Sequence, residues 1–500
     1  MFGLKNIVQS IAGLGSNKIA TDLLGIATQI NTAKSEELPD YFDEMTQRLA
    51  TYNNQASSKT SDLSALLSLD ETTNPICQKI SREFLLNNKE YVQSLPSVLK
   101  YWTELTRFYR LCQRHYQIQV GKKTLSADLK KASVLALRHQ INLIKWDALR
   151  HTKPTNEKWN GLFFIYQFTE EHDFHKEDLS SYQGRTPASC ETLMIRLGML
   201  SLSQTDTLTR HEIEALDILL NSFFKGMILS SKPFRTQFQY SFDLASPMPP
   251  QKIEGAVDSP SYRYWNGEQA LSQLGDVLFN FNKGLSKKLT STFPVLSEPD
   301  WYSLVEKLST SWSQYSGKAI RKEERTATKV WCDLSFGLAN AQTASPNAHF
   351  AQHENPSCSI VDKSHSGFGL IYTGPFKQSL ELKALLLICS KDIKNALAIV
   401  KRMQHLPDGG TTIGAQKLGE NAVTIEINEV GNPIIFHALF VPQQSSNSQT
   451  RFLLVAPELG VVGKKMFINN ANQKFMISIT QIMGEFLDCK QVTFDVIQQH

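Results

Sequence analysis

The chain has 500 residues, of which 41% are hydrophobic and 20% are charged, and its formal net charge is +4. This length predicts about two to four domains, because a single hydrophobic core stops growing well before it. The composition is that of a globular protein and excludes a mainly disordered chain. The mild positive charge argues against general nucleic-acid binding, but it is compatible with a local basic pocket for a phosphate-bearing ligand.

The N-terminal stretch, residues 1–30, has apolar residues interrupted by polar ones, which predicts an amphipathic helix and not a signal peptide. We expect it to dock on its own domain; contact with a membrane surface or a partner is the alternative. The sequence has no run of roughly 18 apolar residues, so we expect no membrane span. Seven scattered cysteines without a C-x-x-C pair favour free thiols in a reducing cytoplasm over disulfides or a zinc site.

From about residue 75 to 230, apolar residues recur at helical spacing. They mark two long helices, over Val98–Tyr116 and Val134–Ala148, and two further helices over Cys190–Leu202 and Ile213–Leu229. Short loops between them predict helical hairpins, without the fixed period of a proven repeat array. We interpret the aromatic stripes as core, with a peptide-binding groove between helices as the minority interpretation.

Beyond these helices the pattern changes twice. Alternation of Phe238, Tyr240 and Phe242 predicts a strand. The following residues, 246–260, are punctuated by prolines and indicate a boundary or linker. Helical periodicity then returns over 268–289 and 299–314.

The middle of the chain carries the pattern on which a functional interpretation depends. Arg321 and Arg325 are four residues apart, between a helix candidate that ends at a glycine and a strand-like run over Thr328–Leu334. Arg110 and Arg114 have the same spacing, but they lie on a stretch with helical periodicity. There we interpret them as two arginines on a solvated helix face.

A second element follows downstream, where Asp362, Ser364 and Gly367 form an Asp-x-Ser-x-x-Gly turn. It lies between two strand candidates, Cys358–Val361 and Phe368–Tyr372. Asp and Ser make side-chain-to-backbone turns, and Gly allows positive φ or close approach of a ligand. By itself the pattern is also that of an ordinary hairpin turn, so the arginine pair upstream is what favours a ligand site.

Together, R-x-x-x-R and D-x-S-x-x-G resemble the motifs of the PilZ domain family, and the resemblance covers roughly residues 317–430. PilZ domains are small bacterial β-barrels that bind the second messenger cyclic di-GMP, often as a stacked dimer. The resemblance implies that Arg321, Arg325, Asp362, Ser364 and Gly367 bind this ligand. The chemistry is suitable, because planar guanidinium groups bond bidentately to guanine edges and phosphates, and a carboxylate accepts hydrogen bonds from guanine N–H groups.

The β pattern continues to the end of the chain. Runs over Leu382–Cys389, Asn395–Gln404 and Thr411–Leu418 extend the expected barrel. Five more runs after residue 430 predict a second β unit, which is either a PilZ-like barrel without the motif or an extension of the first sheet. We therefore expect a multidomain α + β fold with an all-α helical domain at 1–245, a linker with connecting helices at 246–316, a PilZ-like antiparallel β-barrel at 317–430 and the second β unit at 431–500.

The expected function is that of a cytoplasmic cyclic di-GMP receptor that couples ligand binding to a change in domain arrangement or in binding of an unidentified protein partner by the helical domain. The alternative is a scaffold or adaptor in which the helical domain binds a partner and the barrel is only structural. We find no catalytic motif and expect no enzyme and no cofactor beyond the ligand. We also expect no metal, because the His172–His175 cluster with its neighbouring glutamates is typical of a solvated surface. Motility, pilus assembly, secretion and exopolysaccharide synthesis are all compatible with the sequence as the process that such a receptor would control.

Overall fold

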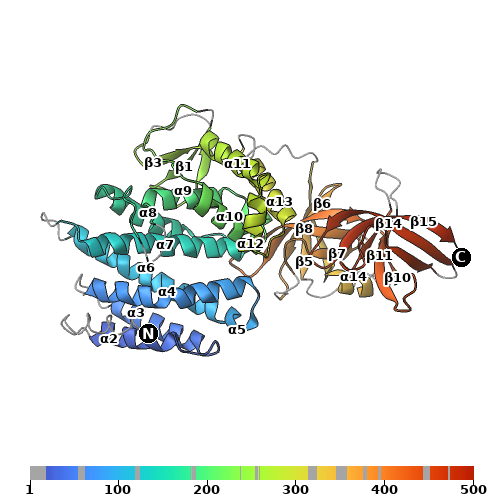
Figure 1. Ribbon diagram of the computed structural model, residues 1–500, viewed down its shortest axis with the longest axis horizontal. Helices are drawn as coiled ribbons and strands as arrows, with labels where there is room; N and C mark the ends of the chain where they lie inside the picture. Colours follow the sequence, from blue (N-terminus) through green and yellow to red (C-terminus); the bar gives the residue numbers. More distant parts are fainter. Residues whose placement is uncertain are drawn as a thin grey trace. The chain divides into compact units, whose positions relative to one another are not determined.

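The structure is a computed structural model of the chain. It describes residues 18–54, 62–118, 124–180, 182, 187–236, 238–253, 257, 259–313, 324–344, 357–375, 380–391, 393, 396–442, 451–470 and 473–499. The chain divides into two compact units: one holds Met1–Arg150, Pro154–Thr205 and Arg210–Lys318, and the other holds His151–Lys153, Asp206–Thr209 and Ala319–His500. Figure 1 shows the helices of the first unit in blue to yellow and the strands of the second in orange to red.

The first unit is built mainly from amphipathic helices that bury their apolar stripes against one another. Helix α6 packs against α3, α4 and α7, and α7 packs in turn against α8 and α9. The helices of this unit are α2 (Lys18–Ile30), α3 (Leu38–Asn54), α4 (Leu63–Leu85), α5 (Lys89–Val92), α6 (Ser94–Ile118), α7 (Ala127–Leu149), α8 (Asn156–Glu171), α9 (Cys190–Ser201) and α10 (Arg210–Phe223). The 3-10 turn η2 (Thr205–Thr207) begins in this unit at Thr205, and its other two residues belong to the second unit. The helices predicted from periodicity are confirmed, although α10 ends at Phe223 and not at Leu229. The aromatic residues Tyr101, Trp102, Phe108 and Tyr109 of α6 are buried. The first part of the predicted N-terminal helix lies outside the described residues.

A small antiparallel sheet and three more helices complete the unit. The sheet has the order β2-β1-β3, from β1 (Gln239–Asp243), β2 (Gln251–Ile253) and β3 (Tyr262–Asn266). It leads into α11 (Gly267–Phe281), α12 (Leu285–Thr292) and α13 (Glu298–Trp312). Ser297 and Asp300 form a capping box that starts α13. The sequence predicts a linker with connecting helices over 246–316; α11, α12 and α13 lie in this range, and the strands and helices of this part of the compact helical unit bury large aromatic side chains such as Trp265 and Trp301.

A buried carboxylate joins several helices of this unit. Asp70 on α4 is 1% exposed, and it accepts hydrogen bonds from the hydroxyls of Tyr109 on α6 and of Tyr182, each at 3.0 Å. Its Oδ2 also lies 2.8 Å from Nε2 of His139 on α7. Burial, and secondly the charge of Asp70, raises the pKa of both phenols well above the usual value. The cluster therefore holds α4, α6 and α7 through a single acceptor group.

The second unit begins with a closed antiparallel barrel of strand order β4-β5-β6-β9-β8-β7. Long β4 pairs with β5 through its first half and with β7 through its second half, which closes the barrel. The elements are β4 (Thr326–Phe336), α14 (Leu338–Ala344), β5 (Cys358–Lys363), β6 (Gly367–Tyr372), β7 (Leu385–Ser390), β8 (Ala396–His405) and β9 (Thr411–Gly419). These strands follow the runs predicted from sequence, whereas α14 lies in a stretch that the sequence indicates only as polar.

The tail forms a second closed antiparallel barrel of order β10-β11-β12-β15-β14-β13, and it does not extend the first sheet. Its strands are β10 (Val423–Glu429), β11 (Phe436–Val441), β12 (Phe452–Val455), β13 (Lys465–Asn470), β14 (Gln473–Glu485) and β15 (Lys490–Gln499). Strand β10 pairs with β11 and β13. The second barrel thus includes a strand that lies within the range predicted for the first.

The two barrels share an apolar cluster. Outward side chains of β7 and β8 meet those of β11 and β12, and Leu338 and Ala341 of α14 join them. Asp488, in the β14–β15 hairpin, accepts a hydrogen bond from the backbone N–H of Leu338 at the start of α14. The outer face of the first barrel is therefore covered by the second barrel at β7, β8 and α14.

Two further observations concern the whole chain. No described helix is both long and apolar enough to cross a bilayer. All seven cysteines are buried and none forms a disulfide, as the sequence predicts.

Candidate ligand-binding face of the first barrel

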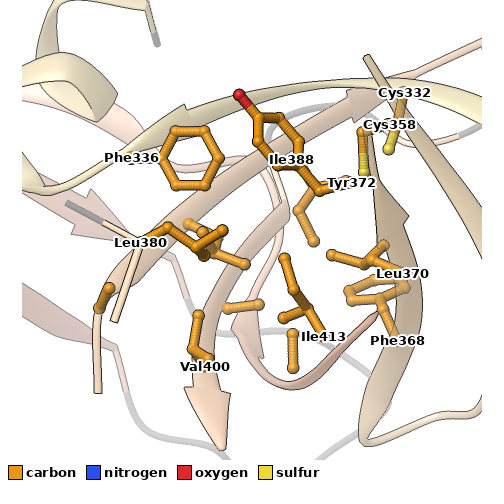
Figure 2. Packing of buried hydrophobic residues seen from close by; sticks show 14 of the residues in the cluster. Cys332, Phe336, Cys358, Phe368, Leu370, Tyr372, Leu380, Ile388, Val400 and Ile413 are labelled. Atoms are coloured by element: carbon orange, nitrogen blue, oxygen red, sulfur yellow. The ribbon is translucent and has the colours of Figure 1, made fainter. Parts of the chain in front are cut away.

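The interior of the first barrel is filled. Figure 2 shows apolar side chains from opposite strands packed against one another in its centre, with the thiols of Cys332 and Cys358 beside them. The phenol of Tyr372 packs edge-on against Phe336 at a ring-centroid distance of 5.4 Å. Because side chains fill the middle of the barrel, a ligand of dinucleotide size would bind on the outer face or the rim.

Residues from both halves of the predicted motif come together on that outer face. Arg325 directly precedes β4, and Asp362 lies near the end of the neighbouring strand β5, where it is paired with Ala327. Nη1 of Arg325 lies 2.5 Å from Oδ1 of Asp362, although the two residues are 37 apart in sequence. Both side chains are about one-third exposed, at 33% and 32%. Arg321 lies outside the described residues.

The turn that follows Asp362 is tied to two strands. The backbone N–H of Ser364 donates to the carbonyl of Gly367 at 2.9 Å, and that of Lys417 on β9 donates to the carbonyl of Ser366 at 2.9 Å. Ser364 is half-buried. A Cβ on Gly367 would lie 2.5 Å from the carbonyl oxygen of Ala415. This position therefore needs glycine for the pairing of β6 with β9, a structural reason that the sequence pattern does not reveal.

A β-bulge places Asp362 on the outside. Ile360 is paired with the inward Leu370, and Asp362 is paired with Gly369, so that Val361 is the extra residue in β5. In a regular strand, Asp362 would instead be opposite the inward Phe368 and would point into the apolar interior. Bulges commonly redirect a side chain in this way beside functional sites.

A second bulge acts in the same way on β8. Val400 is paired with the inward Ala415 and Arg402 with Gly414, so that Lys401 is the extra residue. The bulge places Arg402 on the outer face, where its side chain is 58% exposed. Nε of Arg402 lies 2.9 Å from Oδ2 of Asp206, which belongs to the same compact unit. A second guanidinium therefore lies on the barrel face that carries Arg325.

The two bulges create a row of outward positions across five strands: Ala327, Asp362, Gly369, Gly414 and Arg402. Two glycines, Gly369 and Gly414, lie in the centre of this row between an acidic residue and a basic one; Gly369 is buried, and the carboxylate of Asp362 lies over it. Neighbouring strands are about 4.8 Å apart, so the backbones of Asp362 and Arg402 are separated by roughly 14 Å. Trp331 of β4, 46% exposed, lies on the outer face further along β4 and is paired with Ser359, three residues before Asp362.

Comparison with known families gives a match in the other half of the chain. Residues 26–233 are similar to the family model described as "Cyclic-di-GMP receptor FimW, N-terminal domain". No curated protein and no solved structure matched the chain.

The matched residues lie within the helical part of the chain, from α2 to the residues after α10, and end before β1. The resemblance predicted from sequence lies instead in the first barrel, over roughly 317–430. The family match therefore does not extend to a PilZ domain or to its expected location.

The structure adds four residues to the candidate face that the motif does not contain: Gly369, Gly414, Arg402 and Trp331. One sequence signal was available, since Gly367 and Gly369 alternate within a strand, and glycine in a strand interior often marks close approach of another group. The other three positions depend on strand register and on bulges.

Proposed function

We propose that this chain is a cyclic di-GMP receptor whose first barrel is PilZ-like and binds the dinucleotide on its outer face. The observation that carries the proposal is the contact between Arg325 and Asp362, two residues from the two halves of the motif, on the outer face of the barrel. The similarity of residues 26–233 to a cyclic di-GMP receptor family supports the choice of ligand. Arg321, Ser364 and Gly367 complete the proposed site on the strength of the motif.

The residue types suit the two kinds of group on this ligand. The guanidinium of Arg325 donates to guanine O6 and N7 or to phosphate oxygens, and the carboxylate of Asp362 accepts from guanine N1–H and the exocyclic amine. Gly369 leaves room for the carboxylate of Asp362, Gly414 leaves the neighbouring strand without a side chain, and Trp331 offers an indole face for stacking, which is worth about 1–3 kcal/mol per base. Family members often bind two stacked ligand molecules, and we propose the same stoichiometry here.

We further propose that binding is coupled to domain arrangement in a cytoplasmic protein. Arg321 and Arg325 lie between α13 and β4, so a ligand that holds both arginines would fix the segment joining the two units. Such a ligand shifts an existing equilibrium towards the arrangement that it binds more tightly. The helical unit would then present or withdraw a surface for a protein partner.

Isothermal titration of the full-length chain with cyclic di-GMP tests the site. Arg325→Ala should weaken binding about 10- to 100-fold, because one good bidentate contact to guanine is worth about 1–3 kcal/mol. The matched control is Arg48→Ala, which removes an arginine that is 44% exposed and ion-paired at 2.6 Å with Glu44. Failure of the wild-type chain to bind, or equal affinity in Arg325→Ala and wild type, would reject the site. The first of these results would favour the adaptor alternative.

Small-angle scattering tests the coupling separately. Saturating cyclic di-GMP should change the radius of gyration of the wild-type chain and leave that of Arg325→Ala unchanged at the same ligand concentration. An unchanged scattering profile for a saturated wild-type chain would contradict the coupling while leaving the binding site intact.

A further inference from the structure

Arg110 and Arg114, on the helical unit, are held in an arrangement that the sequence does not predict. Both lie on α6, one turn apart, and both guanidiniums lie against the ring of Phe164 on α8, at 5.4 Å and 5.2 Å from its centroid. Figure 1 shows α6, α7 and α8 as neighbours within this unit. The interpretation of two arginines on a solvated helix face is wrong for Arg110, which is only partly exposed.

The surroundings of Arg110 leave its charge uncompensated. Its Nε is buried and has no hydrogen-bond partner. Its Nη1 would lie 3.1 Å from a Cβ on Gly161, so the small residue on α8 makes room for the guanidinium. Burial, followed by the like charge of Arg114, lowers the pKa of Arg110. Within the described part of the chain, neither arginine has an ion-pair partner.

Two other partly buried cations of this unit, one on α7 and one on α8, are neutralised by carboxylates. Lys145 of α7 is bound to Glu214 and Asp217 at 2.7 Å and 2.6 Å, and Lys158 of α8 is bound to Asp147 at 2.5 Å. Buried charge without a partner is strongly unfavourable, and two like charges held together add to the cost. The Arg110–Arg114 pair therefore differs from its neighbours in lacking an anion.

We propose that Arg110, Arg114 and Phe164 form a phosphate-binding site on the helical unit. The two guanidiniums start from backbone positions about 6 Å apart along α6 and converge on one ring. A phosphate group has enough oxygens to accept from two planar guanidiniums at once, whereas a carboxylate is matched by one. Phe164 is partly exposed and keeps both guanidiniums in place through cation–π contacts. This proposal depends on these three residues alone, and it does not require that the barrel binds a ligand.

Arginine-selective labelling of the full-length chain with phenylglyoxal, read out by peptide mass spectrometry, tests the site residue by residue. Pyrophosphate at about ten times its dissociation constant should slow labelling of Arg110 and Arg114 about tenfold, since about nine-tenths of the sites are then occupied. Labelling of Arg48 should be the same in pyrophosphate and in sodium chloride of equal ionic strength. A parallel sample with cyclic di-GMP tests whether this dinucleotide is a source of the phosphate.

Protection by either probe supports the site and identifies which source it accepts. Equal labelling rates with pyrophosphate, cyclic di-GMP and chloride would overturn it. The same spectra report Arg325, so loss of the barrel site and loss of the helical site give different results. In a second measurement, pyrophosphate should raise the melting temperature of the wild type but not of Arg110→Gln/Arg114→Gln. An equal rise in both would also overturn the proposal, and the labelling of the wild type decides the matter if the variant fails to fold.

Discussion

Replacing Gly369 with alanine separates the carboxylate of Asp362 from its ion pair without touching either residue. A Cβ at this position would lie 2.6 Å from Oδ1 and 2.7 Å from both Cγ and Oδ2 of Asp362. No Cβ is accommodated at such distances, so the Asp362 side chain must rotate away and give up its 2.5 Å contact with Arg325. The change therefore displaces one polar group of the proposed site by steric means.

The expected effects on stability and on binding differ greatly in size. An ion pair that is about one-third exposed contributes about 0–1 kcal/mol to folding. Alanine in a strand recovers roughly 0.5–1 kcal/mol relative to glycine, so the free energy of unfolding should change by less than about 1 kcal/mol. Loss of hydrogen bonds from a ligand to a charged acceptor costs about 1.5–3 kcal/mol, so the affinity for cyclic di-GMP should fall about 10- to 100-fold.

Titration calorimetry with cyclic di-GMP and urea-induced unfolding measure the two quantities on the same preparation. Gly275→Ala on α11 is the matched control, because a Cβ there meets nothing within 4 Å, and it should leave the affinity unchanged. A folded Gly369→Ala chain that binds as tightly as the wild type would refute the argument that the position of the Asp362 carboxylate matters. Asp362→Asn checks the same point without added bulk and should weaken binding in the same direction.

Three further predictions concern the helical unit. Asp70→Leu should lower its free energy of unfolding by about 3–5 kcal/mol in urea, because buried donors lose a shared acceptor, while exposed Asp43→Leu should change it by less than about 0.5 kcal/mol. Since the pKa values of Tyr109 and Tyr182 are raised in the folded state, the contribution of these two phenols to stability should be constant up to about pH 9 and then fall by about 1.4 kcal/mol per pH unit per tyrosine above about pH 10; a flat profile above about pH 10 by chemical denaturation would contradict this. Lys145→Met should cost about 2–4 kcal/mol, because it leaves Glu214 and Asp217 without their cation, whereas Lys100→Met at a 64% exposed position should be nearly neutral in thermal unfolding.

Much of the fold can be predicted from local pattern. The stripes of α6 and α7 repeat with the period of a helix, and the runs of β4 to β9 are rich in residues that favour strands, because in each case one face must be buried. Strand β10 was not predicted, and its place in the second barrel depends on pairing with β13, far along the chain. Closure of each barrel is likewise a long-range event that periodicity cannot reveal.

By itself, the sequence determined the secondary structure of most elements, the division into helical and β regions, and Arg325 and Asp362 as candidates through their motif. Only the tertiary structure decided which side chains lie on the outer face of the first barrel and which residues contact one another. Two one-residue bulges place Asp362 and Arg402 on the outer face, because a shift of one residue reverses every side chain of a strand. The two R-x-x-x-R pairs have the same spacing in the sequence, but their arginines have different partners. Folding brings the ring of Phe164 to Arg110 and Arg114, and it brings Asp362 to Arg325.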